Sequence, residues 1–320
     1  MTIIIMHSPP KAHFRVAIPI RNFNAGSEAF RDLAGRCAVT YINTTGRRLD
    51  GEELAAAIAD ADGIIAGTEP YPASVLDRAP ALKIISRVGV GIDSIDAACT
   101  GSRGIAVRTT PGPVTRAVAE HTLALILSAL RNIPQYQHRL RTGNSEPVGG
   151  AMLSGKTVGI IGFGRIGRTV AGMLSALGCR ILFFDPFLAG SANGGPWEPA
   201  ASLDDLLGRA DIVSIHASAA EGGTPIMTGE RFSRCKKGMI LVNTARGSHI
   251  DEASLIAAIE DGTVAHACLD VFSHEPYQGP LLAFSQVIAT PHVATFTRES
   301  RMLMEREAVD NIIRFLEETT

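Results

Sequence analysis

The chain has 320 residues, of which 46% are hydrophobic and 19% are charged, and its formal net charge is -2. Such a composition is typical of a globular protein and provides enough apolar residues for about two domains. The near-neutral balance points to neither nucleic acid nor an anionic membrane as a partner. Five dispersed cysteines without a C-x-x-C pair argue against a disulfide framework or a metal site and favour reduced thiols in the cytoplasm.

Residues 1–13 lack the basic start, long apolar core and small-residue cleavage site of a secretory signal. We interpret them as an extension before the first strand and assign them no function. The longest apolar run, residues 123–130, belongs to an amphipathic helix and is far shorter than the ~18 residues of a membrane span. We therefore expect a cytoplasmic protein with no membrane partner.

Short β-branched runs alternate with Ala- and Leu-rich stretches in the first third of the chain. This rhythm predicts βαβ units and a parallel sheet covered by helices. The expected strands are 14–20, 38–43, 63–67 and 83–89, the expected helices are 26–35, 50–61 and 72–80, and a run with two prolines at 105–113 ends the block.

A long helix at about 114–132 and a Gly/Ser/Pro-rich loop at 142–154 precede a second βα series. Its expected strands are 156–162, 180–185, 211–217, 239–245, 266–272 and 286–291, and its expected helices are 165–177 and 202–210. A last helix at about 298–317 has no strand after it, which indicates a return to the first block.

These elements predict an α/β protein with two Rossmann-like, doubly wound parallel-sheet domains. We expect the cofactor domain, 108–293, to be inserted into a discontinuous substrate domain formed by 1–107 and 294–320. Two chain segments, near 108 and 293, would then cross a cleft between the domains.

The candidate cofactor site is a Gly-x-Gly-x-x-Gly motif between a strand and a helix. Gly162 permits the tight turn, Gly164 lets the backbone approach a pyrophosphate, and Gly167 allows helix and strand to pack closely. The helix N-terminus then offers N–H groups to the phosphates. Asp185 ends the next strand, where its carboxylate would bind ribose hydroxyls and repel a 2′-phosphate, which favours NAD over NADP. The candidate residues are Gly162, Gly164, Arg165, Ile166, Gly167 and Asp185.

Other chemically active residues follow strand ends in the same series: Arg246, Asp270, Glu275 and His292. Ligands of open α/β sheets bind beyond the carboxyl ends of the strands, so these side chains are expected to converge although they lie up to 46 residues apart. Singly, the histidine could be a core residue, the glutamate a turn residue and the arginine a surface ion-pair partner.

Six segments occur in order between residues 84 and 295: SRVGVGIDSID, AEHTLALIL, GIIGFGRIG, VNTARG, LDVFSHEP and TPHVA. In these segments the chain resembles the D-isomer-specific 2-hydroxyacid dehydrogenases of the phosphoglycerate dehydrogenase-like type. The resemblance implies hydride transfer between NAD and C2 of a D-2-hydroxy acid or 2-keto acid. It also implies a homodimer built on the helix at 114–132.

The resemblance implies a role for each candidate. His292 would be the acid/base, Glu275 would hold the imidazole and favour its protonated form, and Arg246 would bind the substrate carboxylate. Backbone N–H groups near Val88, Gly89 and Val90 would bind the same carboxylate. Asp270 would hold the nicotinamide amide, with Thr244, Ala245 and Val293 lining its pocket.

Three points stay open at this level. Residues 217–227 depart from the family's pattern, which leaves their cofactor contacts and that of His216 in doubt, and His121 is interpreted as structural. Substrate choice is expected to depend on loop 66–72, where Glu69 and Tyr71 stand and an acid would disfavour a phosphate unless it faces away. The alternatives are an NAD-sensing, co-repressor-like binding protein and an NADP-linked glyoxylate or hydroxypyruvate reductase, against which Asp185 argues; a formate dehydrogenase would lack the glutamate at 275.

Overall fold

The computed structural model describes residues 14–188, 196–218 and 224–319. The chain divides into two compact units, one formed by the segments before Thr115 and after Phe296, the other by Thr115–Phe296. These divisions fall a few residues from the domain boundaries expected from the sequence. No helix within the described residues is long and apolar enough to cross a membrane.

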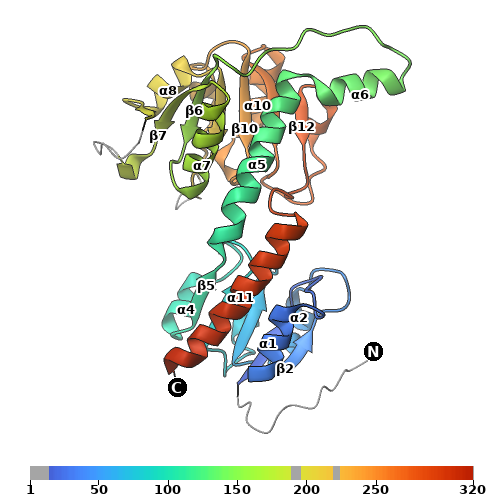
Figure 1. Cartoon of the computed structure of the whole chain (residues 1–320), viewed down its shortest axis with the longest axis vertical. Helices are drawn as coiled ribbons and strands as arrows, with labels where there is room; N and C mark the ends of the chain where they lie inside the picture. Colours follow the sequence, from blue (N-terminus) through green and yellow to red (C-terminus); the bar gives the residue numbers. More distant parts are fainter. Residues whose placement is uncertain (1–13, 189–195, 219–223, 320) are drawn as a thin grey trace. The chain divides into compact units, whose positions relative to one another are not determined.

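The first unit is built on a parallel sheet whose five described strands have the order β2-β1-β3-β4-β5. Figure 1 labels its two edge strands, β2 and β5. In sequence order this is 2-1-3-4-5, the flavodoxin-like arrangement. The strands are β1 (Arg15–Ile18), β2 (Ala38–Ile42), β3 (Gly63–Ala66), β4 (Ile84–Arg87) and β5 (Ala106–Thr109). The helices are α1 (Glu28–Arg36), α2 (Gly51–Ile58), α3 (Ala73–Leu76), α4 (Ala97–Ser102) and α11 (Arg298–Thr319).

The last helix, α11, packs on this sheet. Its residues Ala308, Val309 and Ile312 are fully buried, and the Ser86 hydroxyl of β4 donates a hydrogen bond to Ala308 O at 2.9 Å. A buried Asn311 amide donates to Thr109 O at the end of β5. The C-terminal segment therefore completes the core of the unit with which the chain began.

The second unit has a parallel sheet with seven described strands in the order β12-β11-β10-β9-β6-β7-β8. Numbered from β6, this contains the Rossmann order 3-2-1-4-5-6, with the reversal of direction between β6 and β9. The strands are β6 (Thr157–Ile161), β7 (Arg180–Phe184), β8 (Glu198–Pro199), β9 (Ile212–Ile215), β10 (Met239–Asn243), β11 (Val264–Leu269) and β12 (Val287–Ala289). The predicted fold class is confirmed.

Helices cover both faces of the second sheet. On one face, α5 (Pro111–Leu130), which starts in the first unit, and α7 (Arg165–Ala176) bury Ile126, Ala129 and Leu174 against the strands. On the other face, α8 (Leu203–Arg209) and α10 (Glu252–Glu260) bury Leu206 and Leu255. The remaining described helices are α6 (Ile133–Arg141), α9 (Gly229–Phe232) and the short 3-10 turns η1 (Pro186–Leu188), η2 (Gly247–His249) and η3 (Pro280–Ala283).

Candidate active site at the strand ends

The glycine motif forms the turn between β6 and α7. Gly162 has φ 87°, and a Cβ atom there would lie 2.4 Å from Ala217 N, so this position accepts only glycine. A Cβ atom at Gly167 would lie 2.2 Å from Gly162 O. Gly164 is the N-cap of α7 and has no side chain to cap it, so the N–H groups of the first turn, at Arg165, Ile166 and Gly167, are available to an anion.

Asp185 follows β7 and is fixed beside this turn. Its Oδ2 accepts a hydrogen bond from Phe163 N at 2.8 Å, and its Oδ1 accepts one from Phe187 N at 3.0 Å. The carboxylate therefore lies next to the backbone of the glycine motif, although 22 residues separate Asp185 from Phe163. These residues fit a dinucleotide, since they combine a phosphate-binding helix end with an acceptor for ribose hydroxyls.

Asn243, the last residue of β10, shapes the loop that carries Arg246. Its buried amide donates to Arg246 O at 2.7 Å, and its Oδ1 accepts from Ala245 N at 3.0 Å. Arg246 Nη1 donates to Ala245 O at 2.7 Å. Thr244 is buried, and its hydroxyl is engaged with Thr122 Oγ1 of α5 at 3.1 Å. Its predicted place in a nicotinamide pocket stays a prediction.

The central feature of the site is a histidine–glutamate pair beyond β11 and β12. His292 Nδ1 lies 2.8 Å from Glu275 Oε2, and Glu275 Oε1 accepts from Phe272 N at 3.1 Å. The side chains remain 47% and 36% exposed, so a ligand can reach the ring. Burial alone would raise the pKa of Glu275, but the hydrogen bond and charge of His292 together with the hydrogen bond from Phe272 N lower that pKa.

Asp270 anchors the segment that carries His292. Its side chain is fully buried, with Oδ1 accepting from Thr290 Oγ1 at 2.6 Å and Val293 N at 2.9 Å, and Oδ2 accepting from Ala294 N at 3.0 Å. Its carbonyl oxygen accepts from His292 N at 2.8 Å. Burial alone would raise the pKa of Asp270, but hydrogen bonds from His121, Thr290, Val293 and Ala294 lower it. These bonds hold His292 at φ 54°, in the left-handed region.

The loops of Arg246 and Glu275 touch each other. A Cβ atom at Gly247 would lie only 2.0 Å from the carbonyl carbon of Phe272, whose N–H binds Glu275. The Phe272 ring stacks on Tyr277 at 4.1 Å, and the Tyr277 hydroxyl donates to Glu252 at 2.7 Å. The second unit thus brings the segments of its three predicted catalytic residues to one edge of the sheet.

In the first unit, internal hydrogen bonds use most of the backbone N–H groups that were predicted to bind the substrate carboxylate. Val88 N already donates to Ala66 O at 2.8 Å, and Gly89 N donates to the Thr110 hydroxyl at 2.7 Å. The ladder between β3 and β4 and the end of β5 therefore use two of the three N–H groups. Within the part of the chain that the structure describes, Val90 is the one of the three whose N–H has no acceptor.

The acid of loop 66–72 faces inward. Glu69 is 1% exposed, and its Oε2 accepts from Gly67 N at 2.8 Å and from the Tyr71 hydroxyl at 3.4 Å. Tyr71 is itself fully buried, and burial and the neighbouring Glu69 raise its pKa. An acid in this loop was expected to disfavour a phosphate unless it faced away. Glu69 does face away, because its side chain points into the unit.

Two other histidines differ in their surroundings. Burial lowers the pKa of His216 to about 4, so it is neutral at physiological pH, and its Nε2 lies 2.9 Å from Ser214 Oγ. Part of the departing loop that follows it, residues 219–223, lies outside the described residues. His121 of α5 contacts both Thr290 and Asp270, an arrangement that the sequence did not predict.

The chain is similar to known proteins in sequence and in fold. Residues 123–294 match the model of the D-isomer specific 2-hydroxyacid dehydrogenase, NAD binding domain. The chain is 39% identical over 256 residues to the D-3-phosphoglycerate dehydrogenase of Mycobacterium tuberculosis, covering 79% of this chain and 48% of that protein, so it spans about half the length of such relatives.

It is also 39% identical over 259 residues to the glyoxylate reductase of Aeropyrum pernix, covering 78% of this chain and 77% of that protein. The solved NADPH-dependent glyoxylate/hydroxypyruvate reductase of Sinorhizobium meliloti superposes with a TM-score of 0.82 at 30% identity over 95% of each chain. The chain therefore belongs to the D-isomer-specific 2-hydroxyacid dehydrogenase family.

Proposed function

We propose that the chain is a dehydrogenase that interconverts a D-2-hydroxy acid and the corresponding 2-keto acid with NAD. The observation that carries the proposal is the 2.8 Å contact between His292 Nδ1 and Glu275 Oε2 at the strand ends of a Rossmann-type unit. Since Nδ1 faces the carboxylate, Nε2 is the ring nitrogen left for a substrate. The cofactor, when bound, would take up or give the hydride at the substrate's C2.

In oxidation, His292 Nε2 would take the proton from the substrate hydroxyl as the carbonyl forms. In reduction, the Nε2–H group would give that proton back to the carbonyl oxygen. The imidazolium of His292 exists after proton uptake in oxidation and before proton release in reduction, and Glu275 would stabilise it in both directions. Arg246 would bind the substrate carboxylate through its planar guanidinium.

We propose NAD rather than NADP as the cofactor. The carboxylate of Asp185 lies beside the glycine turn, where we expect the ribose of the dinucleotide, and it would repel a 2′-phosphate. Residues 186–195 contain no lysine or arginine that could offset this repulsion. The Sinorhizobium enzyme, described as NADPH-dependent, makes an NADP-linked reductase the second candidate. The ratio of kcat/KM for NADH and NADPH with one keto acid decides between them.

The substrate class is open to direct measurement. Relatives include D-3-phosphoglycerate dehydrogenases and glyoxylate reductases, and the inward-facing Glu69 removes one argument against a phosphorylated substrate. We propose a small 2-keto acid without a phosphate, because loop 66–72 carries no arginine or lysine. NADH oxidation should be measured against glyoxylate, hydroxypyruvate, pyruvate and 3-phosphohydroxypyruvate. A kcat/KM for the phosphorylated acid well above the others would contradict this choice.

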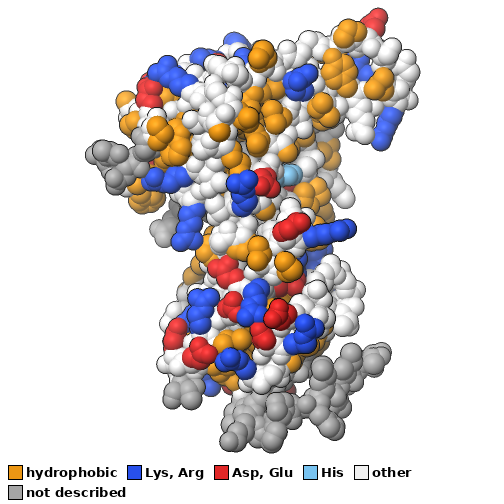
Figure 2. Space-filling model, viewed as in Figure 1, with side chains coloured by type: hydrophobic (Ala, Val, Ile, Leu, Met, Phe, Trp, Pro, Cys, Tyr) orange, Lys and Arg blue, Asp and Glu red, His pale blue; other side chains and the backbone are white. Residues whose placement is uncertain are grey.

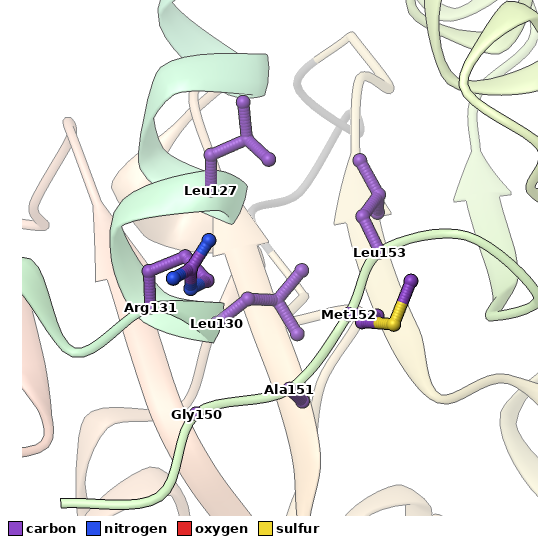
Figure 3. A pocket seen from close by; sticks show the side chains of 7 residues that line it. All are labelled: Leu127, Leu130, Arg131, Gly150, Ala151, Met152 and Leu153. Carbon is purple, nitrogen blue, oxygen red and sulfur yellow. The ribbon is translucent and has the colours of Figure 1, made fainter.

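We also propose a homodimer that covers the apolar surface beside α5. Leu127, Leu130 and Arg131 at the end of the helix and residues 150–153 line a cavity of about 490 Å³ (Figure 3). Met152 is 77% exposed, and Leu140 of α6 is 64% exposed. Figure 2 shows hydrophobic side chains along this part of α5 and around α6. Such an apolar surface typically marks an interaction site.

A second copy of the chain is the occupant that family membership supports. Light scattering should give the mass of two chains for the wild type and of one chain for Met152→Glu. The exposed Glu120→Gln change serves as a control that leaves the mass unchanged. A wild-type mass of one chain at micromolar concentration would contradict the proposal.

A further inference from the structure

His121 links the long helix α5 to the segment that carries the proposed acid/base. Its Nε2 lies 3.1 Å from Thr290 Oγ1 and 3.4 Å from Asp270 Oδ1, and its side chain is 22% exposed. Its two partners lie far along the sequence, with Thr290 169 residues away. His121 lies on an otherwise apolar helix face. Its polar partners are therefore Thr290 and Asp270, which lie outside its own helix.

The hydrogen bonds fix the direction of each proton. Asp270 is ionised, because its hydrogen bonds lower its pKa, and an ionised carboxylate only accepts. Thr290 must therefore donate its single hydroxyl proton to Asp270 Oδ1, at 2.6 Å. The Thr290 oxygen can then only accept from His121, so His121 carries its proton on Nε2. The result is a chain of donors from His121 through Thr290 to Asp270.

We propose that His121 is a positioning residue for His292. The inference rests on the proposed function for its catalytic meaning. Asp270 holds the N–H groups of His292, Val293 and Ala294, and His121 holds the carboxylate and the hydroxyl that complete this anchor. The helix α5 and the loop of Asp270 thereby fix the backbone of His292 at φ 54°, and this backbone keeps the imidazole Nδ1 against Glu275.

Removal of the His121 donor would weaken this anchor rather than any contact with substrate. The Thr290 oxygen, which is half-buried, and Asp270, which is fully buried, would each lose a partner, and this costs more than the loss of an exposed hydrogen bond. A left-handed backbone at a residue other than glycine persists only where its surroundings enforce it. The segment should then open more often, and the imidazole should leave its productive position.

The test compares His121→Leu, which removes the donor, with His121→Gln, which offers an amide N–H at about the same distance. Glu120→Gln, on the exposed side of the same helix, is the matched control. For each variant, kcat, the Kd for NADH and the hydrogen exchange of the Val293 and Ala294 amides are measured. His121→Leu should lower kcat and amide protection about tenfold with an unchanged Kd for NADH, while His121→Gln should recover most of both.

A second variant tests whether the residues act as one chain. Thr290→Val removes the intermediate hydroxyl, so the double variant His121→Leu/Thr290→Val should lose no more kcat than the worse single variant. Additive losses of kcat in the double variant, or wild-type amide protection in His121→Leu, would overturn the inference.

The two proposals fail in different ways. A wild-type protein that oxidises NADH with no 2-keto acid refutes the proposed function. Hydrogen exchange does not need turnover, so loss of protection at Val293 and Ala294 in His121→Leu would still support the positioning role. Unchanged protection would refute that role whether or not the wild type is active.

Discussion

Replacing Gly247 by alanine should disable the site without touching a catalytic side chain. The added Cβ atom would lie 2.0 Å from Phe272 C, 2.3 Å from Phe272 O and 2.4 Å from Ser273 N. An ordinary contact begins at 3.4 Å, so the two segments must separate by about 1.4 Å. These atoms belong to the backbone, and Phe272 N–H donates to Glu275, so the shift moves the carboxylate away from His292.

The size of the effect follows from the size of the shift. A misplacement of about 1 Å can lower a rate about 100-fold, so kcat should fall by about that factor. Overpacking costs about 1–3 kcal/mol, which should appear as a lower free energy of unfolding in urea. Steady-state NADH oxidation with the preferred keto acid measures the first quantity, and binding of NADH shows that the cofactor site remains folded.

Gly172→Ala is the matched control. A Cβ atom there meets nothing within 4 Å, and the residue is exposed inside helix α7. Alanine should stabilise the helix by about 0.5–1 kcal/mol and leave kcat unchanged. If Gly247→Ala kept the kcat of the wild type, the contact between the Arg246 and Glu275 loops would not position the catalytic pair, and this reasoning would be refuted.

Three further substitutions test the proposed roles. His292→Ala should lower kcat about 100- to 10,000-fold while the Kd for NADH, measured by fluorescence titration, stays unchanged. A kcat close to that of the wild type would exclude His292 as the acid/base. Glu275→Gln should move the fall of keto-acid reduction at high pH to lower pH. The reason is that the imidazolium, which the carboxylate stabilises, is the form that gives the proton, and an unmoved profile would remove Glu275 from this role. Asp185→Ala should lower kcat/KM for NADH about tenfold or more and narrow the preference over NADPH, whereas an unchanged preference would contradict its assignment.

Local signals predicted most of the fold. The strand, glycine turn and helix around Gly162 could be predicted because hydrophobic runs and backbone freedom are local properties of the sequence. Helix α6 was missed, since it has no buried residue and starts after Asn132 in a left-handed conformation. Helix α10 was missed although its signal is present: Asp251 caps it through Ser254 N, and Leu255, Ala258 and Ile259 are buried at helical spacing.

The remaining details of the site depend on contacts between distant residues. The use of Val88 N–H and Gly89 N–H depends on where β3, β4 and β5 pair, which no local pattern gives. The inward direction of Glu69 depends on the burial of its loop. His121 meets partners that no pattern within its own helix could indicate, so only coordinates could show its contacts.

The carboxylate of Asp270 accepts hydrogen bonds from main-chain N–H groups, which every residue except proline provides. These two hydrogen bonds therefore do not depend on which side chains occupy positions 293 and 294. Ala294 is buried, whereas Val293 is partly exposed, so position 293 is the one that can change in size and polarity while the imidazole keeps its place. Proline is the replacement that this arrangement forbids.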